Sequence, residues 1–382
     1  MHNLPVTHLI MIIVNAAVFL ISLFITGLII PQILLIAFRK NLFDEVDERK
    51  IHHGKVPRLG GIAFVPAIIF SLAFVIGLSL LPQTTNFMPE MSTDQERALS
   101  FGVCGLMLLY LVGVADDLIG VLYRAKFIVQ IIVACFLVLG GLWINNLHGF
   151  CGVEQWPDIC GCMLTILVCV FFVNAINLID GIDGLASGLS SVALIFYGIV
   201  FAINGDIYNA MVAFATLAAL MQFFYYNVFG STQKRRKIFM GDTGALCIGF
   251  ILTYLSVIIA RKHSFECTDI NPIVCAFAPM LVPCLDVIRV FFNRIRNGVS
   301  PFKPDRTHIH HKMLNLGMST PRAMVSILLI SVAFVVFNVL LSPYLNPAVL
   351  LVIDVVAWLL YSWTLTKRIQ RRKARLESTE NA

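Results

Sequence analysis

The sequence has few charged residues. Only 13% of its 382 residues are Asp, Glu, Lys or Arg, whereas 58% are hydrophobic. A typical soluble domain is about one quarter charged and about half apolar. The mean hydropathy of +0.85 therefore places the chain in lipid rather than in water. The formal net charge of +6 is too modest to indicate nucleic-acid binding.

Three other features are absent. No pair of CxxC spacings occurs, so the ten cysteines do not indicate a zinc site. No internal repeat is visible, which argues against a secondary transporter. The first apolar run, Leu9 to Phe38, is longer than the core of a secretory signal and has no basic segment before it. We expect this run to be the first spanning helix.

Long apolar runs dominate the rest of the chain. A hydrocarbon core of about 30 Å needs roughly 20 apolar residues in a helix. The sequence predicts an all-α, polytopic membrane protein with about eleven spanning helices, in one catalytic domain (1–366) followed by a basic tail (367–382). The predicted spans are 9–36, 60–82, 98–115, 127–146, 161–179, 186–204, 208–229, 244–260, 272–292, 323–341 and 346–366.

Lys and Arg are distributed unequally between the two sets of connections. The odd-numbered connections and the tail hold nearly all of them, while the even-numbered connections hold only Arg97, Arg261 and Lys262. Because cytoplasmic loops carry the excess of Lys and Arg, the N-terminus is predicted outside and the C-terminus inside the cytoplasm.

The first two inward connections combine cations with glycines or carboxylates. The first holds Lys55 and other cations before Gly60-Gly61, which would allow a close backbone approach to an anionic ligand. Its alternative is a basic loop that touches acidic lipids. The second holds Asp116 and Asp117 at the end of a span. One carboxylate would meet a metal ion or phosphate and the other a cation, or both would simply be solvated.

The third inward connection has no Lys or Arg. Asn174 and Asn177 share one helix face. Asp180 and Asp183 follow, each before a glycine, so the helix should break there. Such amides and carboxylates can bind a base, a ribose or a metal ion, which predicts a ligand-binding loop.

The last two inward connections add a second acidic site and a histidine cluster. Asp242 follows a basic run at the start of an apolar helix, where it could cap the helix or, as we favour, bind Mg²⁺ between phosphates. His308, His310 and His311 lie near Arg306. Histidines beside an arginine suit the binding of a pyrophosphate better than the binding of zinc. The alternative is that this segment is a structural loop.

These motifs resemble those of the polyprenyl-phosphate N-acetylhexosamine-1-phosphate transferases. The resemblance runs from about Asp44 to Lys312 and is most specific at Asp116-Asp117, 177–184 and 239–244. The segment 305–311, and Pro57-Arg58, resemble the branch that uses UDP-GlcNAc and undecaprenyl phosphate rather than the peptidoglycan-precursor branch. One departure is an apparent insertion at 231–236, between Asn227 and the metal aspartate.

The resemblance implies a role for each matching residue. Asp242 would hold Mg²⁺, with Mn²⁺ as an alternative, and Asp116 and Asp117 would lie beside the metal and the incoming lipid phosphate. The residues implied to contact the nucleotide are Lys55, Asn177, Asp180 and Asp183, with Phe239 against uracil. The residues implied to contact the pyrophosphate are Arg306, His308, His310 and His311.

The expected activity is transfer of GlcNAc 1-phosphate from UDP-GlcNAc to undecaprenyl phosphate in a bacterial cytoplasmic membrane, with release of UMP. The alternatives are another UDP-N-acetylhexosamine, including UDP-MurNAc-pentapeptide, or a transporter. A transporter should place its carboxylates near the middle of the membrane, whereas here they cluster at helix ends. The expected partners are these two substrates and membrane lipids, without nucleic acid, and a homodimer is left open.

The unequal distribution of Lys and Arg generates a topology prediction. A reporter enzyme that functions only in the cytoplasm should be active when it is fused after Ala382, because the basic tail resists translocation across the membrane. Activity of a periplasm-dependent reporter at the same position would contradict the predicted orientation.

Overall fold

The computed structural model describes residues 4–43, 56–81, 88–262, 264–265, 269–300 and 307–380. Helices dominate this part of the chain, and the single sheet within it is a two-stranded antiparallel hairpin of β1 (Asn146–Phe150) and β2 (Val153–Gln155). The helices are α1 (Leu4–Lys40), η1 (Gly60–Ala63), α2 (Phe64–Ser79), α3 (Thr93–Ile119), α4 (Tyr123–Leu139), α5 (Asp158–Ile179), α6 (Leu185–Ile203), α7 (Ile207–Val228), α8 (Gly241–Ala260), α9 (Pro272–Phe277), η2 (Ala278–Met280), α10 (Leu281–Arg296), α11 (Ile309–Asn315), α12 (Thr320–Leu341) and α13 (Pro347–Glu380).

The predicted all-α, multi-pass architecture is confirmed. Within the described residues, 10 helical segments are long and apolar enough to cross a membrane, and α9, η2 and α10 together form one of them. The remaining predicted span, 127–146, corresponds to α4, which has 17 residues and packs against α3 and α5. Large apolar side chains stay exposed on the flanks of the bundle, among them Leu20 and Phe24 of α1.

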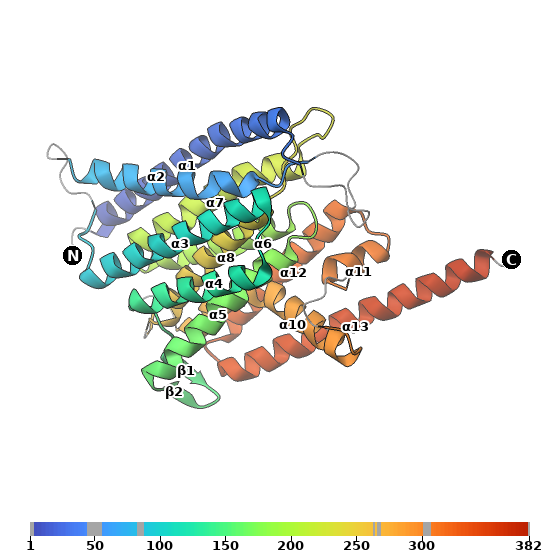
Figure 1. The fold of residues 1–382 in the computed structure, drawn as a ribbon. Helices are drawn as coiled ribbons and strands as arrows, with labels where there is room; N and C mark the ends of the chain where they lie inside the picture. The colour runs from blue at the N-terminus through green and yellow to red at the C-terminus, as the bar shows by residue number, and fades with distance from the viewer. Residues whose placement is uncertain are drawn as a thin grey trace.

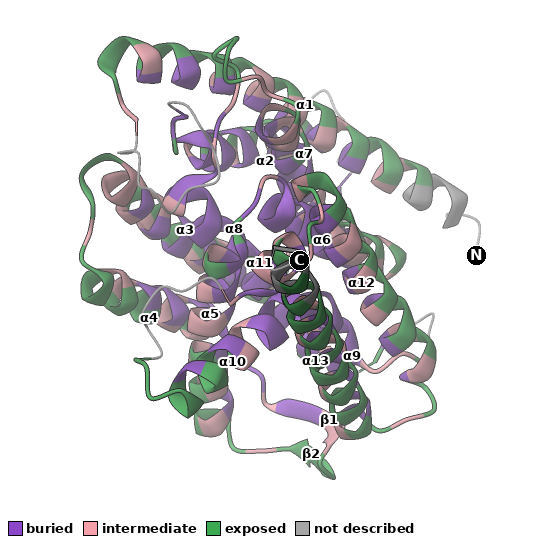
Figure 2. Cartoon of the chain, turned by 90° about the vertical axis from the view of Figure 1, so that its right-hand side faces the viewer, coloured by how far each residue is buried: buried purple, intermediate pink, exposed green. Residues whose placement is uncertain are grey.

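Helix α8 forms the centre of the bundle. Nearly all of its residues are buried (Figure 2), and it packs against α3 and α5. Glycines make this packing close, as in other membrane helix bundles. A Cβ added to Gly113 of α3 would lie 2.5 Å from the Cα of Thr243, and one added to Gly61 would lie 2.1 Å from the backbone nitrogen of Gly244. The start of α8 is therefore fixed between α3 and η1.

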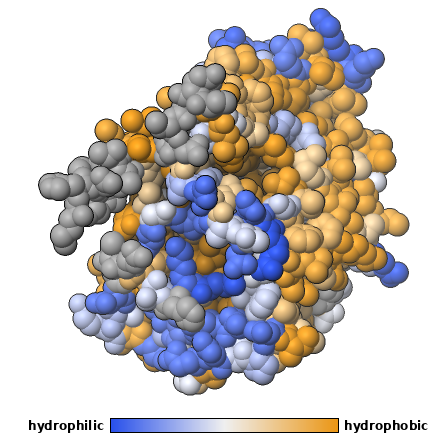
Figure 3. Space-filling model, turned by 90° about the vertical axis from the view of Figure 1, so that its left-hand side faces the viewer, coloured by the Kyte–Doolittle hydropathy of each residue, from blue (hydrophilic) through white to orange (hydrophobic). Residues whose placement is uncertain are grey.

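The predicted inward connections lie together at one end of the bundle. In Figure 1 this is the end at which α1 finishes and α13 reaches the C-terminus. The opposite end carries the β1–β2 hairpin, and Figure 3 shows polar residues gathered there beside apolar flanks. Which end faces the cytoplasm stays a prediction.

Two local features concern the predicted boundaries. The helix break expected after Asn177 is confirmed, since α5 ends at Ile179 and α6 begins at Leu185. Helix α13 continues without interruption from the last span into the tail, so no change of secondary structure marks the predicted boundary at 366. The β1–β2 hairpin was not predicted.

Candidate active site

The buried start of α8 is capped by a carboxylate from another helix. The first backbone N–H groups of a helix have no partner within that helix. Asp117 Oδ1 accepts from the backbone nitrogen of Asp242 at 2.7 Å, and Asp117 Oδ2 accepts from the backbone nitrogen of Thr243 at 3.0 Å and from its Oγ1 at 2.5 Å. Gly241, with φ of 73°, leaves room for this carboxylate. Asp117 therefore fixes the position of α8 relative to α3.

Asp242 is the second residue of α8, and its side chain points to other partners. Its Oδ2 accepts from Lys126 Nζ at 2.5 Å and its Oδ1 accepts from Asn177 Nδ2 at 3.1 Å. The alternative in which Asp242 caps its own helix is wrong, because Asp117 supplies the cap. The carboxylate of Asp242 instead joins α8 to α4 and α5.

Asp116 completes an ionic cluster around Lys126. Asp116 Oδ2 accepts from Lys126 Nζ at 2.6 Å, and its Oδ1 accepts from the backbone nitrogen of Val121 at 2.7 Å. The side chains of Lys126, Asp116 and Asp242 are 22%, 10% and 21% exposed. One ammonium thus bridges two carboxylates that remain reachable from solvent, and the cluster keeps an excess negative charge.

The cluster has the donor chemistry that a magnesium ion uses. No group of three or more His, Cys, Asp or Glu that could hold a metal ion occurs among the described residues. Mg²⁺, however, commonly takes one or two carboxylates together with waters and substrate phosphates. Asp242 and Asp116, with the amide oxygen of Asn177, are hard oxygen donors of this kind. They could hold Mg²⁺ once phosphates supply further oxygens.

The loop between α5 and α6 brings two more carboxylates to this end. Desolvation by the surrounding protein raises the pKa of Asp180 to about 7, although the residue itself is exposed, and the Arg58 guanidinium opposes this shift. Asp183 accepts from Lys237 Nζ at 2.5 Å. A nearly neutral pKa makes the charge of Asp180 sensitive to any cation or anion that binds beside it.

Asn227 has a structural part in this region. Its Oδ1 accepts from the backbone nitrogen of Gly184 at 2.7 Å, and its Nδ2 donates to the carbonyl of Ile238 at 2.9 Å. Asn227 is 5% exposed. Its amide therefore links the start of α6 to the segment that enters α8, instead of facing a ligand.

The segments around Gly60 and Phe239 pair through their backbones. The nitrogen of Phe239 donates to Pro57 O at 2.9 Å, and that of Gly60 donates to Phe239 O at 2.9 Å. The close approach permitted by Gly60 and Gly61 is therefore made to protein, at Phe223 and Gly244. The prediction that these glycines approach a ligand is wrong. Phe239 is partly buried beside this pairing, and Lys55 lies outside the described residues.

The first histidine of the motif is bound to a buried aspartate. His308 Nδ1 donates to Asp286 Oδ2 at 2.8 Å, and Asp286 Oδ1 accepts from Arg289 Nη2 at 2.8 Å and from the backbone nitrogen of Ile309 at 3.1 Å. Asp286 is fully buried. His308 therefore anchors the start of α11 to α10, while Arg306 lies outside the described residues.

His310 reaches into the loop that carries Asp180. A Cβ on Gly181 would lie 2.2 Å from its Nε2, and its ring lies 5.8 Å from that of His308 and 4.2 Å from that of His311. Within the described part of the chain, neither ring nitrogen of His310 has a hydrogen-bond partner. Burial and the two neighbouring histidines lower the pKa of His310 to about 3. A neutral imidazole with unsatisfied nitrogens is suited to hydrogen-bond a ligand.

Several known proteins are similar to this chain in amino-acid sequence. Glycosyl transferase family 4 matches residues 99–260. A protein of Escherichia coli O157:H7 named undecaprenyl-phosphate alpha-N-acetylglucosaminyl 1-phosphate transferase is 30% identical over 370 residues, covering 94% of each chain. The chain belongs to glycosyl transferase family 4.

Other relatives of the family match over similar lengths. A protein of the same name from Yersinia pestis is 29% identical over 351 residues, covering 89% of this chain and 90% of its own. A Bacillus subtilis protein named probable undecaprenyl-phosphate N-acetylglucosaminyl 1-phosphate transferase is 29% identical over 327 residues, covering 85% and 84%. The segment matched to family 4 contains Asp116, Asn177 and Asp242 and ends before the histidine motif.

Some residues of this family 4 site were not singled out from sequence. Lys126 and Lys237 were not predicted as site residues, although each pairs with a site carboxylate. Asp286 and Arg289 lie within a spanning segment. Charged residues there are costly unless they have partners, so their presence in an apolar run was the signal that could have found them.

The two aspartates at the start of α8 should respond differently to the same substitution. Asp117→Asn replaces an oxygen that accepts cap hydrogen bonds by an amide donor, and a buried group left unsatisfied costs about 1–3 kcal/mol. This variant should lose thermal stability in detergent. Asp242→Asn keeps its size and leaves the cap intact, so it should lose clearly less stability than Asp117→Asn, although it removes the ion pair with Lys126.

Thermal unfolding of both purified variants, measured side by side, checks this assignment. Equal stability of Asp117→Asn and the wild type, or an equal loss in both variants, would contradict the cap.

Proposed function

We propose that the chain transfers GlcNAc 1-phosphate from UDP-GlcNAc to undecaprenyl phosphate and releases UMP, at the cytoplasmic face of a bacterial cytoplasmic membrane. One observation carries this proposal: the segments holding Asp116, Asn177, Asp180 and His310 come together around Asp242 at one end of a membrane-spanning bundle. The names of the relatives give the substrate class.

The reaction is a displacement at phosphorus. An oxygen of the lipid phosphate attacks the β-phosphorus of UDP-GlcNAc, and the bond from this phosphorus to the bridging oxygen breaks, so that UMP leaves with that oxygen. A phosphate monoester has a second pKa of about 6, so the attacking group is already ionised at neutral pH. The protein therefore needs no strong base, and positioning with charge compensation supplies most of the catalysis.

Asp116 fits a positioning role better than proton abstraction. Both of its oxygens are engaged, one by Lys126 and the other by the backbone of Val121. Asp242 and Asp116 would hold Mg²⁺, which when bound neutralises charge on the diphosphate. Lys126 Nζ, which lies between these two carboxylates, would donate to a phosphate oxygen of the bound substrate.

The loop between α5 and α6 would bind the nucleotide. Asp180 and Asp183 can accept hydrogen bonds from ribose hydroxyls or from the base when they are ionised. Lys237 holds Asp183 at 2.5 Å, which limits the positions of that carboxylate. His310, neutral and adjacent to Gly181, would contact the diphosphate or the sugar from the other side of the loop.

UMP release from the purified protein tests this function. With UDP-GlcNAc, a polyprenyl phosphate and Mg²⁺, UMP and the lipid product should form in equal amounts, and omission of any one component should abolish both. Above the pKa of Asp180, which is about 7, Asp180→Asn should weaken UMP binding on the order of tenfold, as expected for loss of a charged hydrogen-bond partner.

The controls distinguish the alternatives. UMP release without the lipid acceptor would mean hydrolysis, and faster turnover of UDP-MurNAc-pentapeptide would mean the other branch of donors. Either result would contradict the proposed function. Undiminished UMP binding by Asp180→Asn would contradict the assignment of this loop to the nucleotide.

A further inference from the structure

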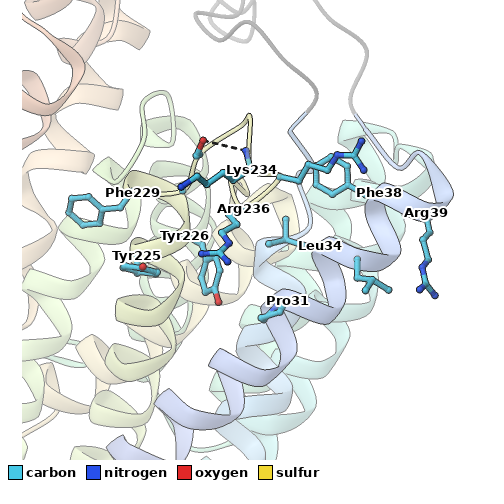
Figure 4. Close-up of a pocket in the computed structure, with 13 residues that line it drawn as sticks. Pro31, Leu34, Phe38, Arg39, Tyr225, Tyr226, Phe229, Lys234 and Arg236 are labelled. Carbon is cyan, nitrogen blue, oxygen red and sulfur yellow. Dashed lines mark hydrogen bonds between the residues drawn. The ribbon is translucent and has the colours of Figure 1, made fainter.

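A pocket of about 910 Å³ lies between α1, α7 and the segment that follows α7. Figure 4 shows its side chains. The apolar and aromatic lining residues come from the two helices, and the cationic ones come from the end of α1 and from the loop 230–236. The lining consists of Pro31, Leu34, Leu35, Phe38, Arg39, Tyr225, Tyr226, Phe229, Gly230, Ser231, Lys234, Arg235 and Arg236.

The apolar part of the pocket extends into a membrane-spanning segment. Pro31 lies nine residues before Lys40, the last residue of α1, which corresponds to about 13 Å along a helix. Leu35 is 45% exposed and lines the pocket. Tyr225 and Tyr226 lie at the end of α7, the depth at which tyrosines line membrane interfaces. The pocket is therefore apolar below and aromatic at its upper edge.

The rim of the pocket is strongly cationic. Arg39, Lys234, Arg235 and Arg236 are exposed, and among the described residues the lining contains no Asp or Glu. The Arg235 guanidinium lies 5.3 Å from the centre of the Phe38 ring, which directs it over the end of α1. In Figure 4, Arg236 points toward Tyr226. Four positive charges thus surround the mouth of an apolar groove.

The turn that carries these cations is held by its own backbone. The nitrogen of Arg236 donates to Ser231 O at 3.0 Å and that of Arg235 donates to Thr232 O at 3.1 Å. The Ser231 hydroxyl accepts from the backbone nitrogen of Lys234 at 3.4 Å. The cations are therefore presented by a folded turn, which reduces the entropy lost when a ligand binds.

We propose that this pocket binds an anionic membrane phospholipid, with its phosphate at the basic rim and an acyl chain in the groove between α1 and α7. Charge complementarity selects an anion, and the apolar depth selects a ligand with a tail. Inorganic phosphate or a free nucleotide would leave the groove below Phe38 unused.

The pocket is distinct from the proposed reaction centre but connected to it. Lys237, the residue after the rim cations, pairs with Asp183, and Phe239 pairs with Pro57. The rim cations instead line the pocket beside α1. A phospholipid held there would steady the segment that leads from α7 to Asp242, so the bound lipid is expected to support the site without taking part in the reaction.

Native mass spectrometry of the full-length protein in detergent tests the proposal. Phosphatidylglycerol should bind, and phosphatidylcholine with the same acyl chains should bind much more weakly. The variant Lys234→Gln/Arg235→Gln/Arg236→Gln should lose affinity for phosphatidylglycerol on the order of a hundredfold, since each basic residue near an anionic lipid contributes roughly fivefold.

A matched variant controls for the loss of three charges. Lys367→Gln/Arg368→Gln/Arg371→Gln removes three exposed cations from α13, away from the pocket, and should bind phosphatidylglycerol as the wild type does. Leu35→Trp, which fills the groove, should weaken the binding of phosphatidylglycerol while leaving the charge of the protein unchanged.

Several outcomes would overturn the proposal. Equal losses in the two triple variants would mean non-specific attraction. Displacement of phosphatidylglycerol by inorganic phosphate at similar concentration would mean that the tail is not bound. Displacement by a polyprenyl phosphate, with tighter binding that also depends on residues 234–236, would mean that the pocket takes the acceptor substrate. Unchanged binding by Leu35→Trp would place the lipid elsewhere.

Discussion

The capping of α8 by Asp117 is the interaction on which the rest of the site depends. Helix α8 begins in the interior of the bundle, where its first backbone N–H groups cannot reach bulk water, and an unpaired buried N–H is costly. Asp117 satisfies those of Asp242 and Thr243. The close contact of Gly113 with Thr243 brings α3 near enough for this. Asp116, which precedes Asp117 in the chain, and Asp242, whose backbone N–H binds Asp117, are consequently held close together.

The pairing of carboxylates with cations then determines which chemistry the assembled site can perform. Lys126 holds Asp116 and Asp242 together, so the site is ordered before any substrate arrives. Asp286 does the same for the histidine motif, because it binds His308 and Arg289 inside a spanning segment. Phosphoryl transfer requires little covalent chemistry from a protein and much positioning. A site whose carboxylates already have internal cations matches that requirement.

The sequence predicted the parts of the structure that follow from hydropathy and from local breaks. Long apolar runs gave the helices, and the glycines after Asp180 and Asp183 gave the end of α5. Adjacent residues of a helix point about 100° apart, so it was predictable that Asp116 and Asp117 would have different partners. Which of them meets Lys126 depends on how α3 packs against α4 and α8, and no local pattern contains that.

Contacts between residues far apart in the sequence could not be predicted from single segments either. The glycines at 60 and 61 signalled a close approach, but only the fold shows that protein backbone is what approaches them. Asp286 and His308 are 22 residues apart, and Asn227 bonds across two chain segments. Lys55 and Arg306 lie outside the described residues, so their implied contacts stay predictions.

Lys126 is an internal cation between Asp116 and Asp242, at the place where we propose that a divalent metal ion binds. The most direct measurement is the affinity for Mn²⁺ of the wild type and of Lys126→Gln. Binding is monitored without nucleotide through the electron paramagnetic resonance signal of Mn²⁺. Removal of the competing ammonium should tighten Mn²⁺ binding by at least about fivefold, since a unit charge at this range is worth more than about 1 kcal/mol. Equal or weaker binding by Lys126→Gln would contradict the account.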